Sequence, residues 1–222
     1  SVAAKKTDEA EVLGKRSLAT REFSTQLISA IAELLQDNQL TLPELDAFAV
    51  VSGPGSFTGL RVGLSAVKAM AEVTARPVLA VSRLAIMASM AEDCDGLVHA
   101  VLDAGRGEFY HGAYRAVGEE YVAESLETLE SLAATFNRTP GLVVASEPNV
   151  LAALSALPDV APCPIPYATV REALPLVLTA WQMRRFTDVA LLDANYLHRI
   201  NPGIVSKAAG NPKPTDTRAD RT

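Results

Sequence analysis

Residues 46–74, DAFAVVSGPGSFTGLRVGLSAVKAMAEVT, contain the pattern that decides the fold. The apolar run over 48–52 predicts a buried strand, and the glycines and proline that follow over 53–56 predict a turn. From about Phe57 the apolar residues recur with helical spacing, which predicts a long helix. The stretch is therefore a strand, turn and helix unit, around which the rest of the chain is expected to be arranged.

The turn has a specific local chemistry. Gly53 and Gly55 permit backbone angles that other residues avoid, and Pro54 between them has a fixed φ. Ser56 and Thr58 each offer a hydroxyl that is able to cap the first helical turn. The start of the helix is therefore well defined by the sequence.

The helix carries more apolar surface than one sheet needs. Its polar residues form a single stripe, which consists of Arg61, Ser65, Lys68 and Glu72. Two apolar stripes consist of Leu60, Leu64, Val67 and Ala71, and of Val62, Ala66, Ala69 and Val73, with Gly59, Gly63 and Met70 beside them. A surface helix normally has one apolar face. We expect one stripe to cover the chain's own sheet and the small-residue face to admit a helix of a partner. The alternative is a helix buried on all sides within one large core.

Whole-chain composition limits the function classes. The chain has 222 residues, 49% of them hydrophobic, and a formal net charge of −6. This charge disfavours autonomous nucleic-acid binding, which usually needs a clustered basic face. The two cysteines, Cys94 and Cys163, form neither a disulfide framework nor a metal knuckle and suit a reducing cytoplasm. No apolar run reaches the length of a membrane span.

The order of the predicted elements indicates an α/β protein with two similar lobes. Hairpins are predicted over 1–19 and 97–117, and further strands over 78–81, 120–123, 142–145 and 195–197. Besides the helix from Phe57, helices are predicted over 22–37, 83–92, 125–136, 148–156 and 169–185. Strands lead and helices follow in each half. We therefore expect a first lobe over 1–93, a second lobe over 94–202 and a mobile tail over 203–222.

The glycine turn matches no phosphate-binding motif well. Its spacing is G-x-G-x-x-x-G, one residue longer than the dinucleotide fingerprint, and Gly59 is followed by Leu60-Arg61 rather than by the Lys-Ser/Thr of a Walker loop. Ser56 does not stand in a G-x-S-x-G nucleophile elbow. A helix start that binds an anion remains an alternative. We favour a structural turn.

The other candidate chemistry is equally limited. The three histidines, His99, His111 and His198, lack the spacing of metal ligands and are expected to be core or surface residues. Asp103, Arg106 and Glu108 surround a glycine-rich turn between two predicted strands. They form either a small acidic site or a salt-bridged hairpin, of which the hairpin is the commoner case.

Four segments of the chain together resemble a known family. Ser52-Gly53-Pro54-Gly55-Ser56-Phe57-Thr58-Gly59-Leu60-Arg61-Val62-Gly63 closely resembles the hallmark segment of bacterial TsaB, also called YeaZ. Supporting segments are Val78–Leu84, Leu102–Tyr110 and Tyr196–Arg199. The likeness spans nearly the whole chain before the tail.

The resemblance implies a fold and a role. The fold is that of the actin-like ATPase (ASKHA) superfamily, with two ribonuclease-H-like lobes. The role is that of a cytoplasmic, non-catalytic scaffold in the synthesis of tRNA threonylcarbamoyladenosine, where the paralogue TsaD performs the transfer with help from the ATPase TsaE. TsaB lacks the metal-binding histidine pair of TsaD, and this sequence lacks such a pair.

The resemblance also implies partners and surfaces. TsaB pairs with TsaD, or with itself when alone, through first-lobe helices that map onto 22–37 and 57–73. The implied interface residues are Phe23, Leu27, Ile31, Gly59, Val62, Gly63, Ala66, Ala69 and Met70. No cofactor is expected on the chain alone, ATP or ADP would lie at the interface of the complex, and tRNA would be contacted only indirectly. No membrane contact is expected.

Two departures from the family pattern stand out. Family members open with a first strand and an Asp-Thr turn, and this sequence shows neither. In the second-lobe hairpin, Gly105 follows Asp103-Ala104 where the family has Arg, so Arg106 is expected to substitute with a different geometry. The main alternative function is an autonomous nucleotide hydrolase or peptidase-like enzyme of the same superfamily.

Overall fold

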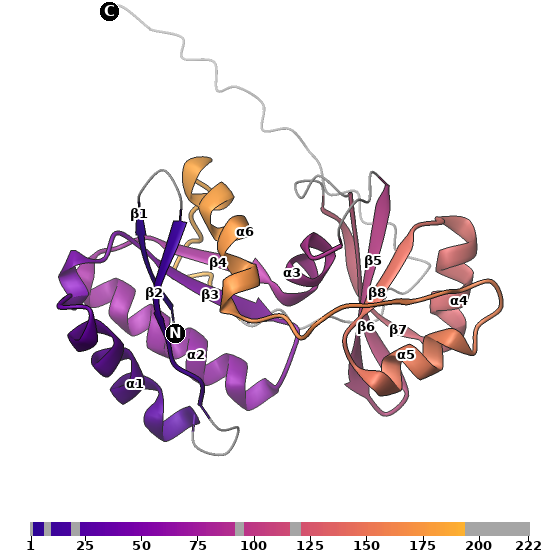
Figure 1. Ribbon diagram of the computed structural model, residues 1–222, viewed down its shortest axis with the longest axis horizontal. Coiled ribbons are helices and arrows are strands. Elements are labelled where there is room, and N and C mark those ends of the chain that lie inside the picture. The colour runs from indigo at the N-terminus through magenta and orange to yellow at the C-terminus, as the bar shows by residue number, and fades with distance from the viewer. Residues whose placement is uncertain (1, 7–9, 19–22, 92–95, 116–120, 194–222) are drawn as a thin grey trace, which may run out of the picture.

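The computed structural model describes residues 2–6, 10–18, 23–91, 96–115 and 121–193, which form two α/β lobes side by side (Figure 1). The strands are β1 (Val2–Lys6), β2 (Ala10–Lys15), β3 (Phe48–Gly53), β4 (Val78–Ser82), β5 (Leu97–Gly105), β6 (Glu108–Arg115), β7 (Tyr121–Thr128), β8 (Leu142–Ala145) and β9 (Cys163–Pro164). The helices are α1 (Phe23–Asp37), η1 (Leu42–Glu44), α2 (Phe57–Thr74), α3 (Arg83–Ser89), α4 (Leu129–Arg138), α5 (Pro148–Ser155) and α6 (Val170–Gln182). The α/β class predicted from the order of elements is confirmed.

The first lobe is built on the parallel pair β3 and β4. Side chains of a strand alternate between its two faces. Phe48 and Val78 pack against α2 in one core cluster, whereas Val81 packs with Ala173 of α6 in another. The pair therefore lies between α2 on one face and α6 on the other, in three layers.

The first lobe departs from the second in its strand pairing. Strands β1 and β2 form an antiparallel hairpin of their own, and β3 and β4 form a separate two-stranded sheet. In the second lobe, β5 pairs with β6 on one side and with β8 on the other, which joins five strands into one sheet of order β7-β6-β5-β8-β9. The described part of the first lobe thus has two short sheets where the second lobe has one.

The second sheet is covered on both faces. One face buries Val98, Ala100 and Leu102 against α3. The other buries Val101 and Val143 against α4 and α5. Because both faces are packed, this lobe has a core on each side of its sheet.

Helix α3 belongs to both lobes. Leu84 and Met87 pack against the second sheet, while Ile86 packs with Val81 and Ala173 of the first lobe. Ser82 begins the helix, as predicted, since its Oγ accepts a hydrogen bond from the Leu84 amide at 3.2 Å. Helix α3, which connects β4 to β5, therefore packs against the cores of both lobes.

The chain returns to the first lobe after the second sheet. Helix α6 packs on β4 (Figure 1). After it, the Thr187 amide donates to the Val78 carbonyl at 2.8 Å, and Leu192 is buried in the core cluster that contains Leu64 and Val67 of α2. The division predicted at residues 93 and 94 placed this segment with the second lobe. In the structure its apolar face is buried against first-lobe residues, which corrects that assignment.

A second correction concerns residues 125–128. They were expected to begin a helix, but they continue β7, whose pairing with β6 runs from Tyr121 to Thr128. The helix begins after Thr128, whose Oγ1 accepts from the Ser131 amide at 3.2 Å. Backbone pairing with β6 outweighs the helical pattern there. The expected extended piece at 195–197 and the tail over 203–222 lie outside the described residues.

Substitution by alanine should have opposite effects on stability at two glycines, Gly141 and Gly63. A Cβ at Gly141 would lie 2.4 Å from the Leu97 carbonyl oxygen, whereas a Cβ at Gly63 would meet nothing within 4 Å. We expect Gly141→Ala to lower the free energy of unfolding by about 1–3 kcal/mol, because backbone has to shift. Gly63→Ala should raise it by about 0.5–1 kcal/mol, because alanine favours the helix. Urea unfolding of both variants measures this, and shifts of the same sign would contradict the packing described.

Candidate functional site

Helix α2 turns one stripe inward. Leu64, Val67 and Ala71 are buried and pack with Phe48 and Val78 of the sheet. These three residues belong to one of the two apolar stripes identified in the sequence. One stripe is therefore used by the chain's own core, as predicted.

The other apolar stripe of α2 faces away from that core. Val73 is 83% exposed, Ala69 is exposed, and Val62 and Ala66 are half-buried. Open space surrounds the position of a Cβ on Gly63. Burial of α2 on all sides, the alternative reading of its sequence, does not occur within the described protomer.

Helix α1 lies beside α2 and adds to this surface (Figure 1). Its buried residues are Ala30 and Leu34, while Ile28 is 59% exposed and Leu27 and Ile31 are half-buried. We call the solvent-accessible apolar residues Leu27, Ile28, Ile31, Val62, Gly63, Ala66, Ala69 and Val73 the α1/α2 face. The side chain of Phe23 lies outside the described residues.

Two residues of the expected interface have other roles or surroundings. Met70 is half-buried and packs against the first-lobe core, so part of its side chain is used within the chain. Gly59 is half-buried, and its amide donates to Ser56 Oγ at 3.5 Å. Nearby, Phe57 is 53% exposed and carries the Arg61 guanidinium 3.8 Å above its ring centroid.

The glycine turn lies at the carboxyl end of β3. Gly53 has a φ of 123°, a region that favours glycine, and the Gly53–Pro54 peptide bond is cis. Ser56 caps α2, as the sequence predicts. A Cβ on Gly55 would lie 3.8 Å from Arg83 Nη1, so the turn approaches the start of α3. The turn thus adjoins the junction between the lobes.

The turn after β5 differs from the salt-bridged hairpin expected. Arg106 is exposed with a φ of 57°, and among the described residues no ion pair joins it to Asp103. Asp103 instead accepts hydrogen bonds from the Gly105 amide at 2.7 Å and from Asn149 Nδ2 at 2.8 Å. A left-handed residue at the tip of a tight turn directs its side chain away from the flanking strands. The expected meeting of Asp103 with Arg106 is therefore wrong.

Polar contacts at this end of the molecule join the lobes. Glu147 Oε2 accepts from the Asp103 amide at 2.8 Å, and its Oε1 lies 4.0 Å from Arg83 Nη2. On the neighbouring strands, Glu124 accepts hydrogen bonds from Ser82 and Tyr114. These acidic groups thus make structural contacts, and the ones with Ser82 and Arg83 hold the start of α3 to the second lobe.

Two histidines that are distant in sequence meet in the second-lobe core. Antiparallel pairing places His99 opposite Ala113 and His111 opposite Val101, so both rings lie on one face. His99 Nδ1 is 2.9 Å from His111 Nε2, and Phe136 packs edge-on against both rings. The sequence predicted that these histidines are core or surface residues, and it did not predict that they form a pair. Hairpin register was the only signal able to reveal it.

The hydrogen bonds define the protonation of this pair. His99 Nε2 lies 2.8 Å from the Thr139 carbonyl oxygen, which requires a donor, so the neutral His99 carries its proton there. His99 Nδ1 then accepts from His111 Nε2–H. Burial, with repulsion from His99, lowers the pKa of His111 to about 3, and burial also lowers the pKa of His99. Both rings are therefore neutral at physiological pH.

This burial predicts a loss of stability in acid. The unfolded chain takes up protons on these rings as the pH falls below about 6.5, whereas the folded chain resists this. Their contribution is therefore complete above about pH 6.5 and declines by about 1.4 kcal/mol per pH unit for each ring that gains a proton on unfolding. Urea unfolding between about pH 7.5 and 5 measures the slope. His111→Phe should have a shallower slope, and an identical slope would contradict the assignment.

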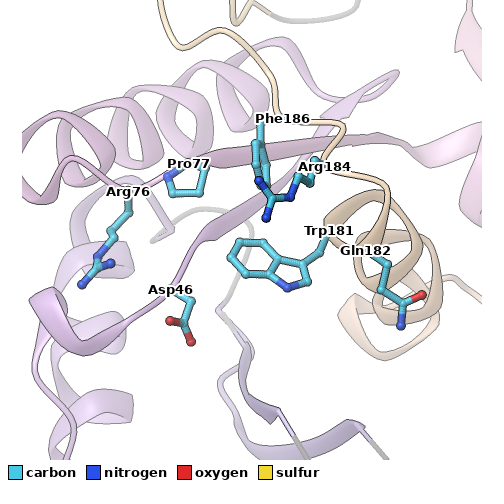
Figure 2. Close-up of a pocket in the computed structure, with 7 residues that line it drawn as sticks. All are labelled: Asp46, Arg76, Pro77, Trp181, Gln182, Arg184 and Phe186. Carbon is cyan, nitrogen blue, oxygen red and sulfur yellow. The ribbon is translucent and has the colours of Figure 1, made fainter. Parts of the chain in front are cut away.

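The first lobe has a pocket that the sequence did not suggest, and Figure 2 shows the residues that line it. The pocket lies at the end of β3 that is opposite to the glycine turn. Its volume is about 630 Å³. Asp46 and Arg76 line it from the amino-terminal edge of β3 and β4, and Trp181, Arg184 and Phe186 line it from the end of α6 and the segment after it. Trp181 is more than 100 residues from Asp46 and Arg76 in the chain, so no local motif could have identified the pocket.

Similar proteins agree with the fold. The family model described as TsaD, tRNA N6-adenosine threonylcarbamoyltransferase, matches residues 16–167. The crystal structure of an uncharacterized protein with similarity to peptidase YEAZ from Pseudomonas aeruginosa superposes on this chain with a TM-score of 0.71 and 26% identity. The match covers 85% of this chain and 90% of that one. The chain thus has the two-lobed α/β fold of the ASKHA superfamily, as predicted.

Sequence relatives narrow the family. The tRNA threonylcarbamoyladenosine biosynthesis protein TsaB of Bacillus subtilis is 35% identical over 95 residues, which span 43% of this chain and 42% of that protein. An uncharacterized protein of Mycobacterium tuberculosis is 36% identical over 156 residues, which span 68% of each. The chain belongs to the TsaB (YeaZ) family, whose named members are tRNA threonylcarbamoyladenosine biosynthesis proteins. The match to the Bacillus protein spans less than half of that relative's length.

Proposed function

We propose that the chain is a non-catalytic partner subunit in tRNA threonylcarbamoyladenosine synthesis. It docks a TsaD-like catalytic subunit through the α1/α2 face and holds that subunit in its active arrangement. One observation carries the proposal: the outward side of α2 is apolar, built of small residues and accessible, with Val73 83% exposed.

The chemistry of the face suits a helix of another protein. Val73 and Ile28 lose apolar area to water only when a second molecule covers them, and burial of such area favours association. Gly63 lets a neighbouring backbone approach closely, because no side chain occupies the space above it. The Arg61 guanidinium, stacked on Phe57, adds a charged group at the amino-terminal end of α2.

A subunit of the same fold is the partner we favour. The family model that matches the chain is that of the transferase itself. Two chains with the same lobe fold present equivalent helices, so they are able to pair about a pseudo-two-fold axis. The same face would pair two copies of this chain when the partner is absent. A TsaE-like ATPase and tRNA would then be reached through the complex, and any ATP or ADP would lie at the interface.

We assign the reacting groups to the partner. The two described histidines form a hydrogen bond with each other in the second-lobe core. Asp103 accepts hydrogen bonds from Asn149 and Gly105. Across the described residues, no group of three or more His, Cys, Asp or Glu side chains is placed to hold a metal ion. Nor does any helix in those ranges have the length and apolar character of a bilayer span. As the resemblance to the family implies, we propose a cytoplasmic scaffold.

Charge on the face should abolish docking. In Gly63→Glu and Ala66→Asp a carboxylate would lose its hydration in an apolar interface, so we expect co-purification with TsaD to be lost. Gly63 has open space around it, so the isolated fold should persist. Matched controls are Gly96→Glu and Ala152→Asp, which place the same charges at exposed second-lobe sites. A pull-down with circular dichroism on each variant tests this, and retained binding by a folded Gly63→Glu chain would refute the docking surface.

Two alternatives, a self-paired chain and an autonomous enzyme, are tested with the same purified proteins. Sedimentation of the chain with and without TsaD distinguishes a self-paired form from a hetero-complex. If the pure chain hydrolysed ATP or peptide, and Asp103→Asn or Glu108→Gln removed that turnover, the chain would be an autonomous enzyme instead.

A further inference from the structure

The pocket at the end of α6 is separate from the docking face and from the junction between the lobes. It opens at the amino-terminal edge of β3 and β4, whereas the glycine turn and the Asp103 turn lie at carboxyl ends of strands. Its volume of about 630 Å³ lies within the ~300–1,000 Å³ usual for small-molecule sites. The pocket is therefore large enough to hold a ligand of its own.

Aromatic rings form one wall of the pocket. The Trp181 indole extends from α6 toward Asp46, with Phe186 beside it (Figure 2). Their ring centroids are 5.5 Å apart and the planes meet at 62°, an edge contact that fixes both rings. Trp181 lines the pocket and is half-buried, so the exposed part of its indole is available to a planar group.

Two guanidinium groups supply positive charge. Among the described residues, no carboxylate lies within 4.0 Å of Arg76 or Arg184, so neither charge is neutralised by an ion pair there. Arg76 Nη2 donates to the Pro43 carbonyl at 2.8 Å, which holds the guanidinium in place. Its Nε is buried and has no hydrogen-bond partner among the described residues. This NH is closed to solvent, so what Arg76 offers to a ligand in the pocket is the charge of its guanidinium.

We propose that this pocket binds a nucleotide, with the base stacked on Trp181 and the phosphate held by Arg76 and Arg184. Asp46 and Gln182 supply an acceptor and an amide for the polar edge of the base or the ribose. The ligand is either a free mononucleotide or an unpaired nucleotide of RNA, since both present the same base and phosphate. The local charge is positive although the whole chain carries −6. An acidic peptide with an aromatic anchor fits the two arginines but uses the flat indole less well.

A single tryptophan makes the site directly observable. Trp181 is the only tryptophan in the chain, so its fluorescence reports on this pocket alone. The full chain is titrated with AMP, adenosine, inorganic phosphate and a short single-stranded oligoadenylate, with selective excitation of tryptophan. We expect saturable quenching by AMP or the RNA. Adenosine and phosphate should bind at least about tenfold more weakly, because each lacks one of the two contacts.

Substitutions test the assignment of the arginines. Arg184 is exposed, so Arg184→Gln should weaken binding about tenfold without unfolding the chain. Arg76→Gln should weaken binding by a similar factor, and circular dichroism of this half-buried variant checks its fold. Arg138→Gln, a matched change on exposed α4, should leave binding unchanged. Tighter binding of the RNA than of AMP identifies RNA as the source, and equal binding identifies the free nucleotide.

Three results would overturn the proposal: no saturable change with AMP or RNA, unchanged affinity in both arginine variants, or tighter binding of an acidic phenylalanine-containing peptide than of AMP. The test uses no TsaD, so its outcome is independent of the proposed docking.

Discussion

The packing of α3 between two sheets is the constraint on which the rest of the structure depends. Leu84 and Met87 fill the core of the second lobe, and Ile86 fills that of the first, so a seven-residue helix is buried on two sides. The hydrogen bond from Ser82 to Glu124, and the approach of Arg83 to Glu147, hold its amino terminus. Removal of this helix would expose both cores at once, so the packing of each lobe depends on it.

This arrangement separates the surfaces that are free to bind from those that are not. The carboxyl ends of β5 and β8, a place where α/β proteins commonly bind ligands, carry hydrogen bonds among Asp103, Glu147 and Asn149. The α1/α2 face and the pocket beside Trp181 lie on other sides of the first lobe and remain accessible. A scaffold role agrees with that distribution, because its binding surfaces lie outside the junction.

Local patterns were sufficient for most elements, and long-range pairing explains the failures. The start of α2 at Ser56 and of α3 at Ser82 followed from hydroxyl caps, whose partners lie two or three residues away. Residues 125–128 looked helical by themselves, yet they pair with β6. Arg106 looked like a partner for Asp103, but the left-handed turn directs it elsewhere. In each failure the deciding contact came from a neighbour in space that the local pattern did not contain.

The amino-acid sequence alone determined the strand-turn-helix unit, the surplus apolar stripe of α2 and the family, because these depend on residue types at short, regular spacing. Only the tertiary structure decided that α6 returns to the first lobe, that His99 and His111 form a hydrogen bond in the core, and that Trp181 and Arg76 line one pocket. The two histidines are 12 positions apart in the chain, and Arg76 and Trp181 are more than 100 positions apart. Sheet register and helix packing set them, and neither is encoded in any single segment.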